Sequence, residues 1–582
     1  MRASPLWALL ATLTAFAGCF GGGGDDDGGG PSTDRELSAA HPFGIFLCDD
    51  GLRTADDAAG GLDDCNHRVT KPLLDPTWFN WTAQHGPANE VSIGVNPTNP
   101  LNVVGGAKDY TVSYISHDLR CDSDPSYPGG YTVWMGTYWS DDGGVTWEND
   151  LMPGFFGDGR PSPLKGNWCN TDPVVVFDDD GTAFFSGLNY DGERSDFGLG
   201  VTNPLYPEAP HDLLSGSQLY VARSDDGGAH YTDFGIMGNG DDGAVFNDKQ
   251  WFAAQPAGNH MVMTWSQFYT APPMPGLSPE SIALIAAQGT DAILFAESMD
   301  AGATWTPQRF FTPGNGLYVD AQFSMPQYLP GGQSVAVIWA TDDVERVPGH
   351  QLPATHHLSY TEGILTPLGL VFQPILSGFE MNPIDSAPDR DGTGPSQFRV
   401  STYPVLAVDT SGGEHDGRRY VVWGDQPGPI DSDVEVLLRW SDDGMTWSEP
   451  VTVNDVAAGD QYIPWIDVDP LGGVHVVWYD RRNDPTNELL DVYYAYSGDG
   501  GATFHPNVRV SETNFNGDLG HHQGGFPFIG DYIGVDADAY AAHLIWSDTR
   551  HTGEAGRLAG SDVYSATLVR DAEAGMVFPA AQ

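Results

Sequence analysis

Two segments near the C-terminal end of the chain repeat one arrangement of tryptophan, aspartate and arginine. They are Trp478-x-Asp480-x-Arg482, which also contains Arg481, and Trp546-x-Asp548-x-Arg550. A planar guanidinium can hold a carboxylate through two parallel hydrogen bonds, so Arg481, Arg482 and Arg550 are candidates for binding an acidic ligand. The same spacing would also let each aspartate and arginine tie neighbouring parts of a fold together. The residues alone leave both interpretations open.

Further ionisable side chains stand at the beginnings of apolar segments. Carboxyl, ammonium and phenol groups that meet in one place can transfer protons or orient a polar ligand. The candidates are Glu90, Asp172, Asp248, Lys249, Asp531 and Tyr532. Whether they meet depends on the elements that carry them.

A phrase of the form Ser-x-Asp-x-Gly-x-Thr-aromatic recurs and indicates how those elements are built. Copies occupy residues 140–147, 224–231, 298–305, 440–447 and 497–504. An aspartate side chain can accept hydrogen bonds from the backbone ahead of it, and glycine adopts angles that a Cβ disfavours. Each copy therefore predicts a tight turn between two strands of a small sheet. The central aspartates are taken as Asp142, Asp226, Asp300, Asp442 and Asp499.

The copies are spaced as a structural repeat. The interval between the third and fourth copies is about twice the others, so one module between 260 and 440 should lack its own copy. Four-stranded sheets repeated around an axis form a β-propeller. The prediction is all-β, with seven blades and six as the alternative. The modules begin near Glu90, Asp172, Asp248, Asp320, Tyr403, Tyr462 and Phe528.

The last module has only three strands, and an N-terminal strand near 66–71 is expected to close it. This predicts an N-terminal segment (41–89), a propeller (90–570) and a C-terminal tail (571–582). The repeated turns join third to fourth strands. The opposite face therefore carries the starts of the first strands and the loops after the second strands, where the candidate residues lie.

Composition supports this class and excludes others. The 73 glycines and 43 prolines, with 40% hydrophobic residues, suit many short strands joined by turns. A formal net charge of −54 would repel nucleic acid. An acidic surface of this kind suits high salt, where screening weakens self-repulsion. Aspartate-rich loops leave room for a structural calcium ion, although no segment matches a complete calcium-binding loop; no other cofactor and no metal ligand is assigned.

The N-terminal residues have the pattern of an exported lipoprotein. Residues 1–19 combine Arg2, an apolar run and a small-residue site before Cys19, which is the predicted lipidation site. Residues 20–40 are rich in glycine and aspartate and should form a flexible tether. The chain is therefore expected on the outer face of a membrane, held only by its lipid anchor and monomeric.

Four other cysteines remain in this predicted exported chain. An even number predicts two disulfides, and the local pairings would be Cys48 with Cys65 and Cys121 with Cys169.

The repeated phrase resembles the Asp box, or bacterial neuraminidase repeat, of sialidase-like propellers. The resemblance spans most of residues 90–570. It implies a propeller and a carboxylate-binding set formed by Arg482, Arg550 and Arg481. It also implies Tyr532 as nucleophile, with Asp531, Asp172 or Asp248 as acid/base. The nearest match to the family's Phe/Tyr-Arg-Ile-Pro motif is at 398–401, in the fifth module.

Two functions of different classes follow. The first is an exo-acting, sialidase-like glycosidase that releases acidic sugars from extracellular glycans, with Glu90 and Lys249 also binding substrate. The second is a propeller that binds an extracellular glycan or protein without chemistry. The first predicts that the candidate side chains converge in one pocket at the mouth of the central channel.

Overall fold

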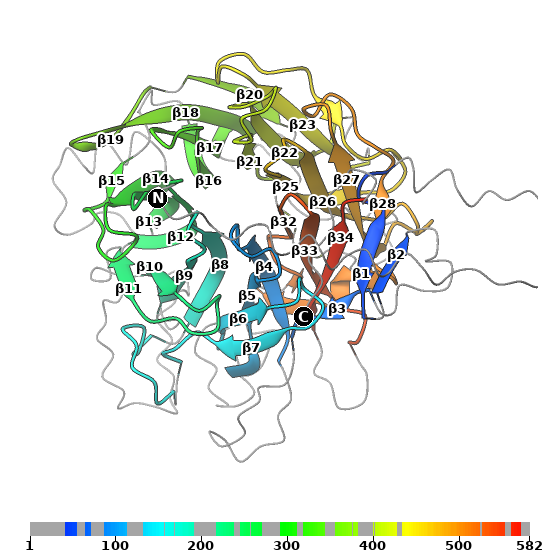
Figure 1. Cartoon of the computed structure of the whole chain (residues 1–582), viewed down its shortest axis with the longest axis horizontal. Helices are drawn as coiled ribbons and strands as arrows, with labels where there is room; N and C mark the ends of the chain where they lie inside the picture. The colour runs from blue at the N-terminus through cyan, green and yellow to red at the C-terminus, as the bar shows by residue number, and fades with distance from the viewer. Residues whose placement is uncertain are drawn as a thin grey trace, which may run out of the picture.

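In a computed structural model the chain is a seven-bladed β-propeller, which confirms the predicted class and blade number (Figure 1). Each blade is antiparallel, with its first strand next to the central axis. The structure describes residues 41–49, 51–54, 65–70, 86–112, 132–155, 158–167, 169–190, 217–237, 245–256, 258–269, 291–310, 318–343, 356–374, 376–381, 398, 400, 402–427, 433–523, 526–552 and 560–571.

Blades 1 to 3 each use four consecutive strands. Blade 1 comprises β4 (Ala88–Val95), β5 (Val103–Asp109), β6 (Trp134–Ser140) and β7 (Glu148–Leu151). Blade 2 comprises β8 (Cys169–Phe177), β9 (Ala183–Tyr190), β10 (Gln218–Ser224) and β11 (Phe234–Met237). Blade 3 comprises β12 (Val245–Ala254), β13 (Met261–Tyr269), β14 (Asp291–Ser298) and β15 (Arg309–Phe310).

Blades 4 to 6 follow the same order, and blades 4 and 6 each carry one extra strand. Blade 4 comprises β16 (Tyr318–Tyr328), β17 (Ser334–Asp343), β18 (His356–Thr366), β19 (Gly369–Phe372) and the extra β20 (Ser377–Met381). Blade 5 comprises β21 (Val405–Val408), β22 (Arg419–Asp425), β23 (Glu435–Ser441) and β24 (Val451–Thr452). Blade 6 comprises β25 (Gln461–Val468), β26 (Val474–Asp480), β27 (Leu489–Ser497), β28 (Val508–Arg509) and the extra β29 (Phe515–Asn516).

The chain ends meet in blade 7. Its first three strands are β32 (Gly534–Ala537), β33 (Ala541–Asp548) and β34 (Asp562–Val569). Two N-terminal pieces pair with β34, namely β1 (Ile45–Cys48) and β3 (His67–Arg68), and β1 also pairs with β2 (Gly51–Thr54). The predicted closing strand is therefore confirmed, but the outer position is shared: β3 lies in the expected segment, and β1 was not foreseen. Before this blade come η5 (Gly517–Leu519), β30 (His521–Gln523) and β31 (Phe526–Phe528).

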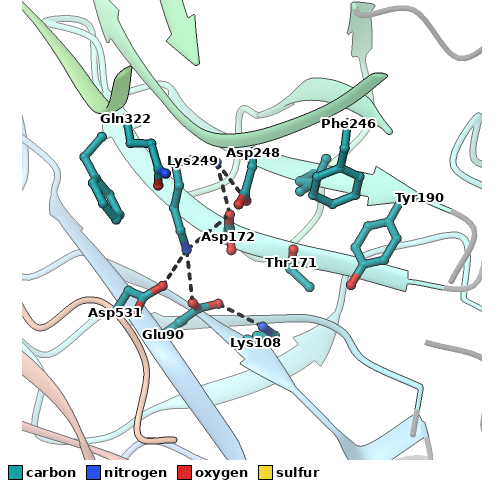
Figure 2. Close-up of a pocket in the computed structure, with 12 residues that line it drawn as sticks. Glu90, Lys108, Thr171, Asp172, Tyr190, Phe246, Asp248, Lys249, Gln322 and Asp531 are labelled. Carbon is teal, nitrogen blue, oxygen red and sulfur yellow. Dashed lines mark hydrogen bonds and ion pairs between the residues drawn. The ribbon is translucent and has the colours of Figure 1, made fainter. Parts of the chain in front are cut away.

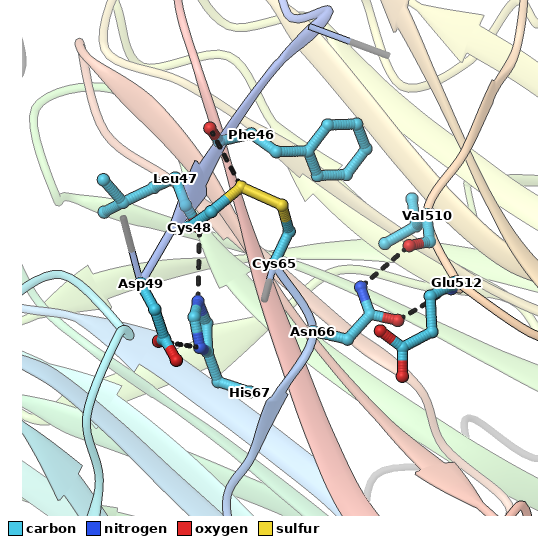
Figure 3. The surroundings of a disulfide bond; sticks show 9 residues. All are labelled: Phe46, Leu47, Cys48, Asp49, Cys65, Asn66, His67, Val510 and Glu512. Atoms are coloured by element: carbon cyan, nitrogen blue, oxygen red, sulfur yellow. Dashed lines mark hydrogen bonds and ion pairs between the residues drawn. A yellow bond between two sulfur atoms is a disulfide. The ribbon is translucent and has the colours of Figure 1, made fainter. Parts of the chain in front are cut away.

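A disulfide joins the two closing pieces (Figure 3). It links Cys48 to Cys65, as the local pairing predicts. Next to it, the Asn66 Nδ2 donates to the Val510 carbonyl at 2.9 Å, which ties the closing segment to blade 6. Cys169 is also in a disulfide. Cys121 lies outside the described residues, so its pairing with Cys169 stays a prediction.

The repeated phrase forms the expected turn. In blade 1 the Thr146 backbone N–H and hydroxyl donate to the two oxygens of Asp142 at 2.8 and 2.6 Å. The Gly144 N–H donates to the Ser140 hydroxyl at 2.9 Å, and Gly144 has a positive φ of 93°. These bonds close the turn and direct Trp147 back against the sheet, where it is buried. The turns lie at the far ends of the third strands, away from the starts of the first strands.

The structure locates the missing copy of the repeat and corrects the central aspartate of another copy. The missing copy belongs to blade 4, where β18 turns directly into β19 through Thr366 and Gly369. In blade 5 the central aspartate is Asp443 and not Asp442. Asp443 accepts from the Met445 and Thr446 N–H groups, because this copy is one residue shorter. Asp442 instead accepts from the Arg418 guanidinium.

The core consists of side chains packed between neighbouring blades. Large tryptophans of the second strands are fully buried there, namely Trp265, Trp339, Trp423, Trp478 and Trp546. Their large rings fill the space between the sheets. The part of the chain that the structure describes contains no helix of the length and apolarity of a membrane span. Cys19 and residues 1–40 lie outside that part, so lipidation, the tether and export remain predictions.

Candidate functional site

A pocket of about 230 Å³ opens on the face opposite the repeated turns (Figure 2). First strands of blades 1 to 4, second strands of blades 1 and 2 and the segment before β32 contribute to it. Its described lining is Glu90, Lys108, Thr171, Asp172, Leu188, Tyr190, Phe246, Asp248, Lys249, Gln322, Phe323 and Asp531. Five of the sequence-predicted site residues therefore line one pocket: Glu90, Asp172, Asp248, Lys249 and Asp531.

A repeated β-bulge positions three of the charged groups. Glu90, Asp172 and Lys249 occupy the same place in the first strands of blades 1, 2 and 3, with positive φ values of 52°, 60° and 52°. The pairing register with the second strand shifts at each of them. A bulge re-aims a side chain, and Figure 2 shows all three pointing toward one another. A positive φ at a residue with a Cβ costs roughly 1–3 kcal/mol and is held only where the surroundings enforce it.

Lys249 is the centre of the cluster. Its Nζ lies 2.5 Å from Asp531 Oδ2, 3.5 Å from Glu90 Oε1 and 3.8 Å from Asp172 Oδ2. The side chains of Asp531 and Glu90 are each 1% exposed and that of Lys249 is 10% exposed. One ammonium therefore joins carboxyl groups from blades 7, 1 and 2 to blade 3. On the other side of Glu90, the Lys108 Nζ lies 3.2 Å from Oε2.

The carboxyl groups of this cluster are held away from their ordinary titration range. Burial raises the pKa of Glu90 to about 7, with Lys108 and Lys249 opposing the shift. Burial also raises the pKa of Asp172 to about 6; Lys249 opposes it, and the neighbouring Asp248 adds to it by charge and by a hydrogen bond. For Lys249 burial acts in the opposite direction, but the carboxylates of Asp172 and Asp531 raise its pKa above the usual value. Near neutral pH Glu90 is thus close to the midpoint of its titration, while Asp172 is mostly ionised.

The open side of the pocket is formed differently. Asp248, Tyr190, Phe246, Gln322 and Phe323 are only half-buried. The rings of Tyr190 and Phe246 meet edge to face, 5.4 Å apart. A ligand would therefore first meet one carboxylate and a corner of aromatic rings, with the charged cluster beneath.

Tyr532 lies next to this cluster but is not among the described lining residues. Its ring packs against Tyr403, Trp251 and Trp465, with centroids 5.8 to 6.0 Å away, and the Lys249 Nζ lies 5.3 Å from its centroid. Burial raises the pKa of Tyr532 well above its usual value although Lys249 opposes the shift. This environment disfavours the phenolate that a tyrosine nucleophile requires.

The three arginines lie elsewhere on the same face. The Arg482 Nε donates to Asp480 at 2.9 Å and its Nη1 to Asp455, in the connection from blade 5, at 2.5 Å. The Arg550 Nε donates to Asp548 at 2.8 Å, and its Nη1 donates to Glu512, in the connection from blade 6.

Arg481 is 1% exposed, and its guanidinium lies over the rings of Phe398 and Tyr462. None of the three arginines is among the described residues that line the pocket. Arg482 and Arg550 tie blades together, which was the structural interpretation, and the geometry offers no support for their binding a substrate carboxylate.

Sequence reasoning missed part of the site. Lys108, Tyr190, Phe246 and the pair Gln322 and Phe323 line the pocket without having been assigned a role. The bulge had a signal that could have exposed it. Proline cannot donate to a sheet ladder, and the bulged residues Asp172 and Ile463 are each followed by proline.

The residues that the structure describes contain no group of three or more histidine, cysteine, aspartate or glutamate side chains placed to hold a metal ion. The carboxyl groups of the pocket surround an ammonium instead.

Comparison with known proteins adds the following. No family model and no curated protein sequence matches the chain. A solved structure of a Dyadobacter fermentans protein of unknown function is 12% identical, with 87% of this chain and 99% of that chain covered and a TM-score of 0.40. A Fusarium graminearum GH93 α-L-arabinofuranosidase is 13% identical over 72% and 92%, with a TM-score of 0.39. A Hadza microbial sialidase is 12% identical over 75% and 76%, with a TM-score of 0.41.

Proposed function

We propose that the protein is a glycoside hydrolase that binds the terminal sugar of an extracellular glycan in the pocket beside Lys249. The observation that carries the proposal is a pair of differently poised carboxyl groups around one ammonium. Glu90 has a pKa raised by burial to about 7, while Asp531 forms a 2.5 Å ion pair with Lys249. Carboxyl groups held in different protonation states in one pocket are what acid/base hydrolysis of a glycoside requires.

The roles follow from position. Glu90 acts as the general acid that donates its proton to the leaving oxygen. Asp172, which shares a hydrogen bond with Asp248, acts as the base that accepts a proton from water as the water oxygen bonds to the anomeric carbon. Oxygens of Glu90 and Asp172 both lie within 4 Å of the Lys249 Nζ, so they are at most about 7 Å apart. That separation is compatible with the roughly 5–9.5 Å between the catalytic carboxyl groups of glycosidases.

The pocket is small enough to favour one sugar unit. At about 230 Å³ it lies below the roughly 300–1,000 Å³ typical of pockets for drug-sized ligands. The side chains of Trp251, Trp465, Tyr403 and Tyr532 meet next to it along the axis. This arrangement favours binding of a chain end, and therefore exo-type action.

The alternative is a propeller that binds a glycan or protein without chemistry. The burial of the cluster favours it, because the side chains of Glu90, Asp531 and Asp172 are 1%, 1% and 4% exposed. Such a network could serve only to join blades 7, 1, 2 and 3. Turnover separates the two functions.

Localisation is part of the proposal. Lipidation of Cys19 and a glycine-rich tether would place a monomeric propeller on the outer face of a cell membrane, where it meets glycans. Its support is the sequence of residues 1–40. Metabolic labelling with a fatty-acid probe should mark the wild-type chain and not Cys19→Ser, and equal labelling of both would refute the anchor.

The test of the hydrolase is a panel of fluorogenic glycosides that includes neutral sugars, amino sugars and a sialoside. We expect turnover of at least one of them. Glu90→Gln should lower kcat/KM for it by about 10²–10⁴-fold, the typical contribution of a general acid. Glu148→Gln, an exposed glutamate of blade 1, is the matched control and should retain full activity.

Arg482→Ala and Arg550→Ala sharpen the assignment. Both substitutions should lower the free energy of unfolding and leave kcat/KM nearly unchanged, because the partners of these arginines are the carboxylates between blades. If these variants fold but have no turnover while Glu90→Gln remains active, the catalytic site would be assigned to the arginines and not to the pocket beside Lys249. No turnover of any glycoside, with retained binding on a glycan array, would favour the binding module.

A further inference from the structure

The charges of the pocket lining are unequal and already partly paired. Four carboxyl groups line it, from Glu90, Asp172, Asp248 and Asp531, against two ammonium groups, from Lys108 and Lys249. Both ammonium groups lie on carboxyl groups: Lys108 is 3.2 Å from Glu90, and Lys249 is 2.5 Å from Asp531. Among the described lining residues there is no arginine. An anionic ligand would therefore have to compete with carboxylates for every cation in the pocket.

The groups that a ligand can reach also favour a cation over an anion. Asp248 is half-buried at the open side, whereas the other three carboxylates are nearly covered. The rings of Tyr190, Phe246 and Phe323 line the same pocket, and Figure 2 shows Asp248 between the cluster and the rings of Tyr190 and Phe246. The faces of aromatic rings carry negative potential and attract ammonium groups, particularly where a carboxylate stands close by. The mouth of the pocket thus combines two features that both favour a cation.

We propose that the pocket selects a sugar that carries a free amino group, with its ammonium seated between Asp248 and the rings of Tyr190 and Phe246. This rests on the proposed glycan-binding function and deepens it. It also departs from the acidic sugar that the resemblance implied, because the cations needed for a carboxylate are committed to Glu90 and Asp531. A carboxylate in the same place would face Asp248 at close range and would be repelled.

Direct binding tests the proposal without requiring turnover. Calorimetry would compare the methyl glycosides of glucosamine, glucose and glucuronate, and then the corresponding galactose series, because the stereochemistry of the sugar is open. In at least one series we expect the amino sugar to bind about tenfold or more tightly than the neutral sugar, and the carboxylate sugar to bind most weakly. Tightest binding of the uronate, or equal binding of all three, would overturn the proposal.

Two variants locate the effect. Asp248→Asn is isosteric and removes the charge at the mouth. It should reduce the preference for the amino sugar about tenfold, while the affinity for the neutral sugar stays nearly the same. Asp179→Asn removes the same charge from an exposed turn at the other end of blade 2 and should retain the preference. A preference that survives in folded Asp248→Asn as in Asp179→Asn would refute the seat at Asp248.

The outcomes for the two proposals are separable. If no glycoside is turned over but amino sugars bind preferentially, the hydrolase fails and the amine preference stands. If neutral glycosides are turned over and the amine confers no advantage in binding, the hydrolase stands and the amine preference fails. The wild-type ligand series decides the matter even if Asp248→Asn does not fold.

Discussion

The two halves of the propeller use one backbone feature for different ends. In blades 1 to 3 the bulged position of the first strand holds Glu90, Asp172 and Lys249. In blades 4 and 6 the same position, with φ values of 56° and 51°, holds Phe323 and Ile463. The backbone conformation is shared, and the side chains are ionisable in one half and apolar in the other.

The apolar half fills the axis by stacking. The ring of Phe323 stacks on that of Tyr403, with centroids 4.5 Å apart, and Trp465 of blade 6 meets Trp251, which blade 3 contributes, at 4.9 Å. The polar half cannot fill space in this way, because each buried charge needs a partner. It forms the Lys249 cluster and leaves a pocket. The bulge is therefore part of the propeller itself, and only its side chain decides whether a blade contributes packing or chemistry.

The largest effect should come from breaking the polar half. Lys249→Met keeps much of the side-chain volume but leaves Glu90, Asp172 and Asp531 without their common ammonium. Removing one partner of a buried ion pair typically costs about 3–5 kcal/mol, so the free energy of unfolding in urea should fall by about that amount. Phe323→Leu at the equivalent place in blade 4 should cost only about 1 kcal/mol.

The comparison of the two unfolding free energies requires that both Lys249→Met and Phe323→Leu are folded. Circular dichroism and a single urea transition would establish that. Equal losses for Lys249→Met and Phe323→Leu would mean that the cluster contributes no more than ordinary packing, and the distinction between the two halves would fail.

A smaller effect should appear as the pH dependence of stability that Glu90 of the polar half contributes. The folded pKa of Glu90 is raised by burial to about 7, against about 4.3 for an unfolded glutamate. Between these values the folded state retains a proton that the unfolded state has lost. The stability linked to Glu90 is therefore complete below about pH 4 and is lost as pH rises to 7, by on the order of 3 kcal/mol.

Glu90→Gln removes this titration and should flatten the pH dependence of stability between pH 4 and 8. Urea unfolding of both proteins at three pH values measures the difference between them, so that the many other carboxylates cancel. Parallel curves for wild type and Glu90→Gln would show that Glu90 does not titrate in this range.

The fold could be predicted because its signals are local and repeated. The Asp142 turn and its copies follow from side-chain hydrogen bonds within a few residues, and their spacing counts the blades. The closing strand was harder to place. A ring needs one more strand, but β1 pairs with β34 across more than 500 residues, and its register depends on packing that no short window contains.

The site was predictable in location more than in role. Strand starts and second-strand ends had to share a face, so Glu90, Asp172 and Lys249 could be grouped. Their convergence on one nitrogen depends on bulges that change register, and a bulge reverses which face a side chain points to. Arg482 and Arg550 show the limit of a short motif. The motif suggested ligand binding, but the carboxylates of Asp455 and Glu512 that pair with these arginines lie far outside it in the sequence.

The smallest effect tests whether the bulge strain itself matters in the apolar half. Ile463 is β-branched and buried at a φ of 51°, a conformation that β-branched residues disfavour strongly. Ile463→Leu removes the branch at Cβ and conserves volume, so lost packing and relieved strain should nearly cancel. The unfolding free energy should change by less than about 1.5 kcal/mol, and ligand affinity should not change, since Ile463 is not among the described lining residues. A large loss of ligand binding in this variant would mean that the two halves are coupled through the bulges, and that the apolar half does more than fill the axis.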